Sequence, residues 1–190
     1  MQKGKGNTGG FGQASATAPD VASLQQLLKP ETTPEQFCKD LAKIFKVRPT
    51  EVALLRLEKG LLKFLHPAEL ATAGSIPVSS STAVAAHTAV TKKVELFNGF
   101  TKVKHASIFE TVKLGKPEED HQIGDHAPIQ KLMSAPILDG KRSVLGVLQI
   151  SRKGLDVSLC GADFTLTDLQ HLEAVTGILS KATFLQIGAK

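Results

Sequence analysis

The sequence has no tryptophan and no tyrosine, only two cysteines, and no long uninterrupted apolar run. Cys38 and Cys160 lie far apart and neither belongs to a C-x-x-C pair, so we expect reduced thiols rather than a disulfide framework or a structural zinc site. No segment approaches the roughly 18 apolar residues of a membrane-spanning helix, and the first residues lack the apolar stretch of a signal peptide. These absences predict a cytoplasmic protein with no membrane partner.

The net charge of +5 is mild but unevenly distributed. No RNA-binding motif with interleaved aromatics and no DNA-reading helix accompanies the basic residues, so we expect no nucleic-acid partner. A small anionic metabolite is the partner that this charge favours. Most of the excess is carried by six lysines, Lys92, Lys93, Lys102, Lys104, Lys113 and Lys116.

The length of 190 residues with 42% hydrophobic residues suits one domain with a substantial core. Residues 1–18 are rich in Gly, Ser, Thr and Lys and poor in large apolar residues, which predicts a flexible N-terminal tail. Residues 19–190 are expected to form a single domain.

Three helices are predicted from capping residues and apolar spacing. The first, Val21 to Leu28, is short. The second begins at Thr33 as N-cap, with Pro34 in the first turn. The last begins at Thr165, with Asp168 three residues later, and should pack beside the second. Their apolar stripes are Phe37, Leu41, Ile44 and Phe45 in the second helix, and Leu169, Leu172, Val175, Leu179 and Ala182 in the last.

Two hairpins are predicted from apolar runs separated by turn residues. In the first, 51–57 and 61–65 are apolar on both faces, so both faces must be covered. In the second, 132–138 and 143–152 are joined at Asp139-Gly140. Its second strand should place Val144, Gly146, Leu148 and Ile150 on one face, and Leu145, Val147, Gln149 and Ser151 on the other.

The segment between the hairpins is expected to hold shorter elements. Ser81 is predicted to cap a helix that ends near Lys92. In this helix Ala83, Ala86 and Val90 share one face. A short strand over 94–97 and a helix over 105–112 should follow. The order of elements predicts an α+β fold with an antiparallel sheet.

The 132–153 hairpin, the segment 81–88 and its sequel 103–110 resemble the GAF domain family, whose members are intracellular modules that bind small regulatory molecules. A PAS or profilin-like relative is the alternative fold. The resemblance covers about residues 33 to 186. It implies a central antiparallel sheet with the terminal helices on one face, often forming a homodimer, and a ligand pocket on the other.

The ligand-binding residues that the resemblance implies come from two segments: Phe97, Asn98, Phe100, Thr101, His105 and Phe109 from the first, and Ser134, Gln149 and Ser151 from the hairpin. The three phenylalanines are equally compatible with core positions. A cavity contact of His87 with a ligand or haem is the less favoured alternative, because a lone histidine more often bonds to backbone groups. Metal-ligand residue types occur at 118–126, but their spacing is that of a solvated loop, so no metal site is expected.

The resemblance implies a sensory or regulatory domain without catalytic activity that signals through a dimer or a downstream partner protein. It does not identify a ligand or a cofactor. One alternative is an enzyme like the family's free methionine sulfoxide reductases, but the set of pocket cysteines that they use is missing. The other is an interaction module whose pocket is filled by its own side chains.

Overall fold

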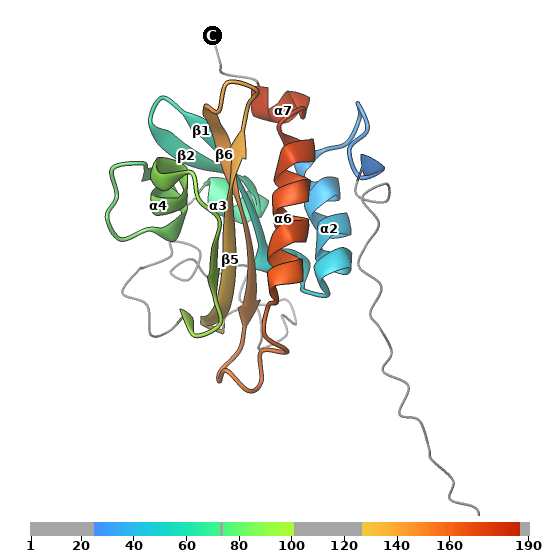
Figure 1. Ribbon diagram of the computed structural model, residues 1–190, viewed down its shortest axis with the longest axis vertical. Coiled ribbons are helices and arrows are strands. Elements are labelled where there is room, and N and C mark those ends of the chain that lie inside the picture. Colours follow the sequence, from blue (N-terminus) through green and yellow to red (C-terminus); the bar gives the residue numbers. More distant parts are fainter. Residues whose placement is uncertain (1–24, 73, 101–126, 187–190) are drawn as a thin grey trace, which may run out of the picture.

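The computed structural model describes residues 25–72, 74–100 and 127–186 (Figure 1). The expected tail over 1–18 and helix over 105–112 lie outside these residues, as does the first half of the expected helix over 21–28. Within them, six antiparallel strands form one sheet, in the order β3-β2-β1-β6-β5-β4. The strands are β1 (Val52–Glu58), β2 (Leu61–His66), β3 (Ser75–Pro77), β4 (Glu95–Phe97), β5 (Ile129–Leu138) and β6 (Val144–Lys153). The helices are α2 (Pro34–Phe45), the 3-10 turn η1 (Pro49–Glu51), α3 (Ala68–Ala71), α4 (Val84–Thr91), α6 (Leu166–Leu179) and α7 (Thr183–Gln186).

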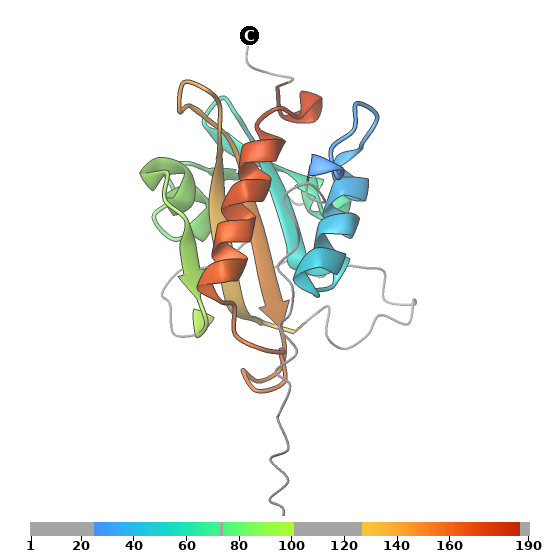
Figure 2. The same cartoon turned by 45° about the vertical axis from the view of Figure 1, so that its right-hand side comes forward.

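The sheet separates two apolar cores. Helices α2 and α6 lie side by side on one face, while α3 and α4 lie on the other (Figures 1 and 2). Alternation along the strands supplies both cores, so Leu54 and Leu148 face α2 and α6 while Leu55 and Val147 face α4. The predicted α+β fold, with both faces of its sheet covered, is confirmed.

Local capping sets where the two long helices begin. The Thr33 hydroxyl accepts a hydrogen bond from the Gln36 amide at 3.2 Å. At α6 the Thr165 hydroxyl accepts from the Asp168 amide at 3.1 Å, and the Asp168 carboxylate accepts from the Thr165 amide at 2.7 Å. Both predicted starts are confirmed, but α6 ends at Leu179, and the chain turns there before α7.

The β5–β6 hairpin is confirmed, but its loop is longer than a two-residue turn. It covers residues 139–143 because the Asp139 carboxylate accepts from the amides of Lys141 and Ser143, at 2.8 and 2.7 Å. The residue in the left-handed conformation is Arg142, with φ of 63°, rather than Gly140. The side chain of Asp139 therefore determines the shape of this loop.

A β-bulge follows the loop. Leu138 pairs with Val144 and Ile137 with Gly146, so Leu145 is an extra residue in β6. Val144 therefore packs against the core under α4 and Leu145 against the core under α2 and α6, the reverse of the prediction. From Gly146 onward the alternation is as predicted.

Helix α4 differs from its prediction at its start and in its inner face. Its N-cap is Ala83 rather than Ser81, because Ala83 is itself extended and buried against the sheet. Val90 is 64% exposed, and Thr88 is fully buried in its place. A threonine turns inward here because its hydroxyl finds partners on the sheet.

Both edges of the described sheet are short. β3 and β4 have three residues each, and β3 ends in Pro77. β4 pairs with β5 only from Glu95 opposite Ser134 to Phe97 opposite Leu132. Beyond that pairing β5 continues with Pro136, which has no amide hydrogen to offer to a further strand.

Candidate functional site

Four buried or half-buried polar side chains are connected on the α4-covered face of the sheet. The Gln149 amide lies 3.2 Å from the Ser134 hydroxyl, which lies 2.7 Å from the Thr88 hydroxyl. Thr88 is in turn 2.9 Å from one carboxylate oxygen of Glu95. The other oxygen of Glu95 lies 2.9 Å from Nδ1 of His87, whose ring is half exposed.

The donor and acceptor of each hydrogen bond in this series follow from the carboxylate of Glu95. A carboxylate only accepts, so Thr88 donates to Glu95 and must accept from Ser134. The single hydroxyl proton of Ser134 is then used, and Gln149 donates to the same oxygen. The two hairpin residues predicted to bind a ligand, Ser134 and Gln149, are therefore already bonded to each other inside the protein.

Two further predicted binding residues also bond to the protein itself. The Ser151 hydroxyl donates to the backbone oxygen of Glu51 at 3.1 Å. The Asn98 amide group donates to the backbone oxygen of Phe164 and accepts from its amide, both at 2.9 Å. Asn98 thus attaches the end of β4 to the residue just before the N-cap of α6. Their roles as ligand contacts remain predictions.

The phenylalanines of this region contact each other. Phe97 and Phe100 meet edge to face, with ring centroids 6.0 Å apart and planes at 68°. Phe100 is buried and Phe97 half-buried, and both belong to the core under α4. Thr101, His105 and Phe109 lie outside the described residues, as does the polar segment 118–126.

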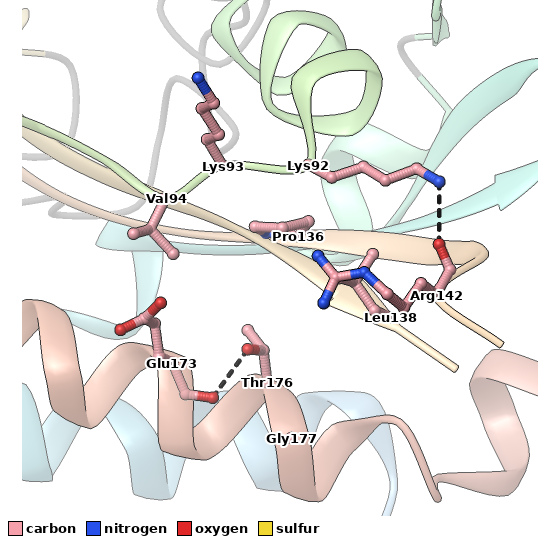
Figure 3. Close-up of a pocket in the computed structure, with 9 residues that line it drawn as sticks. All are labelled: Lys92, Lys93, Val94, Pro136, Leu138, Arg142, Glu173, Thr176 and Gly177. Carbon is pink, nitrogen blue, oxygen red and sulfur yellow. Dashed lines mark hydrogen bonds between the residues drawn. The ribbon is translucent and has the colours of Figure 1, made fainter. Parts of the chain in front are cut away.

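An open groove of about 580 Å³ lies between α6 and the edge of the sheet where β4 begins (Figure 3). Its floor is apolar, one wall carries cationic residues, and the other wall is α6. The lining residues are Lys92, Lys93, Val94, Pro136, Leu138, Arg142, Glu173, Thr176 and Gly177.

The charged groups of the groove do not all point into it. Figure 3 shows the Arg142 guanidinium directed toward the groove, across from Glu173 and Thr176, while the Lys93 ammonium points away from α6. The Lys92 ammonium donates to the Arg142 backbone oxygen at 2.9 Å, which fixes the loop that carries Arg142. The cavity therefore offers one guanidinium and one carboxylate on opposite walls.

Sequence reasoning identified the lysines of this groove but not its two inward-facing charges. Arg142 enters because the loop is longer than an Asp-Gly turn, which the hydrophobic pattern does not indicate. Glu173, Thr176 and Gly177 follow the i, i+3, i+4 spacing of one helix face. This spacing is the signal in the sequence that places the three residues on one wall.

The two cysteines are free thiols on different elements. Cys38 lies on α2 in the core between the helices and the sheet, where burial raises the pKa of its thiol. Cys160 lies in the loop before α6, and its thiol is 3.1 Å from the backbone oxygen of Val157. Neither belongs to the core under α4. The described residues contain no group of three metal-ligand side chains and no helix long and apolar enough to cross a membrane.

Comparison with known proteins gives a fold rather than a close relative. No protein-family model matches the sequence, and no curated protein matches it significantly. The GAF domain of an Acinetobacter phosphoenolpyruvate-protein phosphotransferase superposes with a TM-score of 0.58 at 13% identity, covering 84% of this chain and 89% of that one.

Two other solved structures are similar to the same extent. A methyl-accepting chemotaxis protein gives a TM-score of 0.56 at 12% identity, over 88% of this chain and 96% of that one. A type II free methionine-R-sulfoxide reductase from Thermoplasma acidophilum gives 0.55 at 12% identity, over 87% and 96%. The chain therefore has the GAF-domain fold that its sequence predicts.

Proposed function

We propose that this chain is a regulatory GAF domain that binds a small molecule carrying an acidic group and signals its presence to a partner protein. The observation that supports this proposal is the groove of Figure 3, an open cavity with a guanidinium directed into it. In this proposal the chain acts in the cytoplasm, where a thiol such as that of Cys160 stays reduced.

The lining of the groove restricts the chemistry of the ligand. The guanidinium of Arg142 suits a carboxylate or phosphate, to which it donates two parallel hydrogen bonds. Val94, Pro136 and Leu138 provide an apolar floor for the body of the molecule. Glu173 on the opposite wall repels a second acidic group and favours an ammonium or hydroxyl. We expect a compact molecule with one acidic end and one hydrogen-bond-donating end, of which an amino acid is the simplest example.

Binding in this groove has a direct route to regulation. One wall is α6 and the other is the sheet edge with the β5–β6 loop, so a ligand that contacts both favours the arrangement in which they are correctly spaced. A ligand shifts a conformational equilibrium only through different affinities for the two states. Contacts to two separately positioned elements provide such a difference.

A thermal-melt series tests the proposal with four probes: glutamate, methionine, succinate and inorganic phosphate. At 100 times its dissociation constant a ligand adds about 2.7 kcal/mol of stability. For a domain of this size that corresponds to a rise in melting temperature of roughly 5 to 10 °C. With at least one of these probes we expect a saturable rise in melting temperature that Arg142→Ala abolishes. Lys141 is an exposed neighbour in the same loop, and Lys141→Ala should leave the rise intact.

The same series separates the two faces of the sheet. A rise that survives Arg142→Ala but disappears in Gln149→Met would locate the ligand on the α4-covered face, as the family resemblance implies, and would refute the groove as its site. No rise with any probe, for protein shown by mass spectrometry to carry no small molecule, would favour the ligand-free interaction module.

We propose further that the domain is not a reductase, although the fold is shared with reductases. The buried position and raised thiol pKa of Cys38 support this view, because the thiolate is the reactive form. The alternative predicts thiol-dependent reduction of free methionine sulfoxide that is lost in Cys160→Ser. Turnover of that kind would overturn the non-catalytic proposal.

A further inference from the structure

The loop between β6 and α6 exposes apolar side chains that nothing in the described structure covers. Leu155 and Leu159 are each 72% exposed and Val157 is 37% exposed. They account for three of the five large apolar residues exposed in the described part of the chain. Such a concentration in one short segment marks an interaction surface, because isolated surface leucines are ordinary but clustered ones are not.

The solvent-facing sides of the long helices have a different character. The exposed residues of α2 are polar, and those of α6 are polar or glycine apart from Leu166 in its first turn. The family resemblance implies association through these helices, but their outer surfaces are mostly hydrophilic. The apolar loop is therefore the stronger candidate for the contact surface. The exposed residues of α2 are Glu35, Gln36, Lys39 and Lys43, and those of α6 are Leu166, Thr167, Gln170, Glu173 and Gly177.

The loop is fixed in place at several points. Gln130 donates to the backbone oxygen of Gly154 at 2.9 Å, and the buried Lys131 ammonium donates to that of Gly161 at 2.6 Å. The ammonium also forms an ion pair with Asp163 at 2.7 Å. At the far end Asn98 holds the backbone of Phe164. Both ends of the loop are therefore held, which reduces the backbone entropy lost when the exposed leucines bind a partner.

A cavity of about 650 Å³ lies beside the leucines, between this loop and the C-terminal end of α2. A protruding apolar element and a hollow thus occur next to each other at one end of the molecule, where Figure 1 shows the loop extending below the sheet. The cavity is lined by Lys46, Val47, Arg48, Glu51, Ala127, Arg152, Lys153, Gly154, Leu155, Leu159, Cys160 and Gly161.

Charges of both signs accompany this apolar surface. Lys46, at the end of α2, lines the cavity and is exposed. Asp156, between the exposed leucines, is also exposed, and hydrogen bonds from the Ser158 amide and hydroxyl lower the pKa of its carboxyl. Lys46 is thus a cation beside the apolar residues and Asp156 an anion among them, so a second copy related by a two-fold axis can offer the opposite charge to each.

We infer that the β6–α6 loop is a self-association surface, at which two copies of this chain meet around a two-fold axis. Leu155 and Leu159 of each copy enter the cavity of the other, and Lys46 of each copy faces Asp156 of the other. This inference does not depend on ligand binding in the groove of Figure 3.

Sedimentation equilibrium of the full chain over a concentration series tests the inference. We expect a monomer–dimer equilibrium whose dissociation constant rises about 100-fold or more in the Leu155→Ser/Leu159→Ser double variant. Val90→Ser, which changes another exposed apolar residue on α4, is the matched control and should dimerise like the wild type. Gln170→Arg, at an exposed position of α6, tests association through the terminal helices and should also leave the dimer intact.

A charge exchange provides a test that does not depend on removing apolar residues. Lys46→Asp and Asp156→Lys should each weaken the dimer about tenfold or more, because each places like charges together twice. Mixing the two variants should restore association, since both contacts then join opposite charges. A wild-type monomer at every concentration would overturn the inference. So would a dimer that only Gln170→Arg disrupts, or single charge variants that fail to recover on mixing.

Discussion

Replacing Thr88 by valine tests the directed polar chain under α4. The two side chains have nearly the same shape, so the change removes a hydroxyl without creating a cavity. It deletes the donation to Glu95 and leaves the Ser134 hydroxyl proton without its acceptor. The variant therefore measures directly how much this series of hydrogen bonds contributes to stability.

The expected loss follows from these two changes. A hydrogen bond to a charged group contributes about 1.5 to 3 kcal/mol, and a buried donor left without a partner adds a further penalty. We expect Thr88→Val to lower the free energy of unfolding by about 2 to 4 kcal/mol. For a domain of this size the melting temperature should fall by about 4 to 16 °C.

Urea denaturation of four proteins measures the effect: wild type, Thr88→Val, Ser134→Ala and the double variant. Because the two hydroxyls are direct partners, the double variant should be more stable than additivity predicts, by about 1 kcal/mol. Thr91→Val is the control, since its half-exposed hydroxyl donates only to the His87 backbone oxygen within α4. A loss below about 0.5 kcal/mol for Thr88→Val would refute this series of hydrogen bonds, and so would strict additivity of the two single variants.

Three other changes have expected outcomes. A side chain at Gly146 would collide with the Leu55 backbone oxygen, so Gly146→Ala should lower the free energy of unfolding in urea by about 1 to 3 kcal/mol or more. A Cβ at Gly177 meets nothing within 4 Å, so Gly177→Ala should raise that free energy by up to about 1 kcal/mol, and a loss there would contradict the open space. Burial lowers the pKa of His66 below its ordinary value of 6.5, and its Nε2–H donates to the Pro49 backbone oxygen at 3.1 Å. The unfolded chain then takes up a proton on this group before the folded chain does, so melting temperature should fall as pH drops below about 6.5, and less steeply in His66→Gln.

Those parts of the fold that depend on near neighbours in the sequence are predictable. The N-caps Thr33 and Thr165 lie within three residues of the groups that they bind, and the apolar stripes behind them repeat with the helical period. The two hairpins follow from apolar runs and the turn residues between them. These signals define which helices share a face and which strands pair.

The candidate site depends on contacts between residues far apart in the sequence. Thr88 rather than Val90 faces the sheet because Ser134, on a distant strand, offers a hydrogen-bond partner. Asn98 resembles a ligand-binding residue in sequence, but it is bonded to Phe164 across two layers of the fold. The inward position of Arg142 depends on a loop and a bulge that hydrophobic alternation does not indicate.

The short edges of the described sheet restrict how another protein can attach to this domain. A partner that adds a β-strand needs a row of free backbone groups, and β3 and β4 offer only three residues each. Pro77 and Pro136 interrupt what remains of these edges, so the sheet resists edge-to-edge aggregation at high protein concentration. Within the described part of the chain we therefore expect recognition to use side chains on helices and loops, which can change between homologues without altering the sheet that supports them.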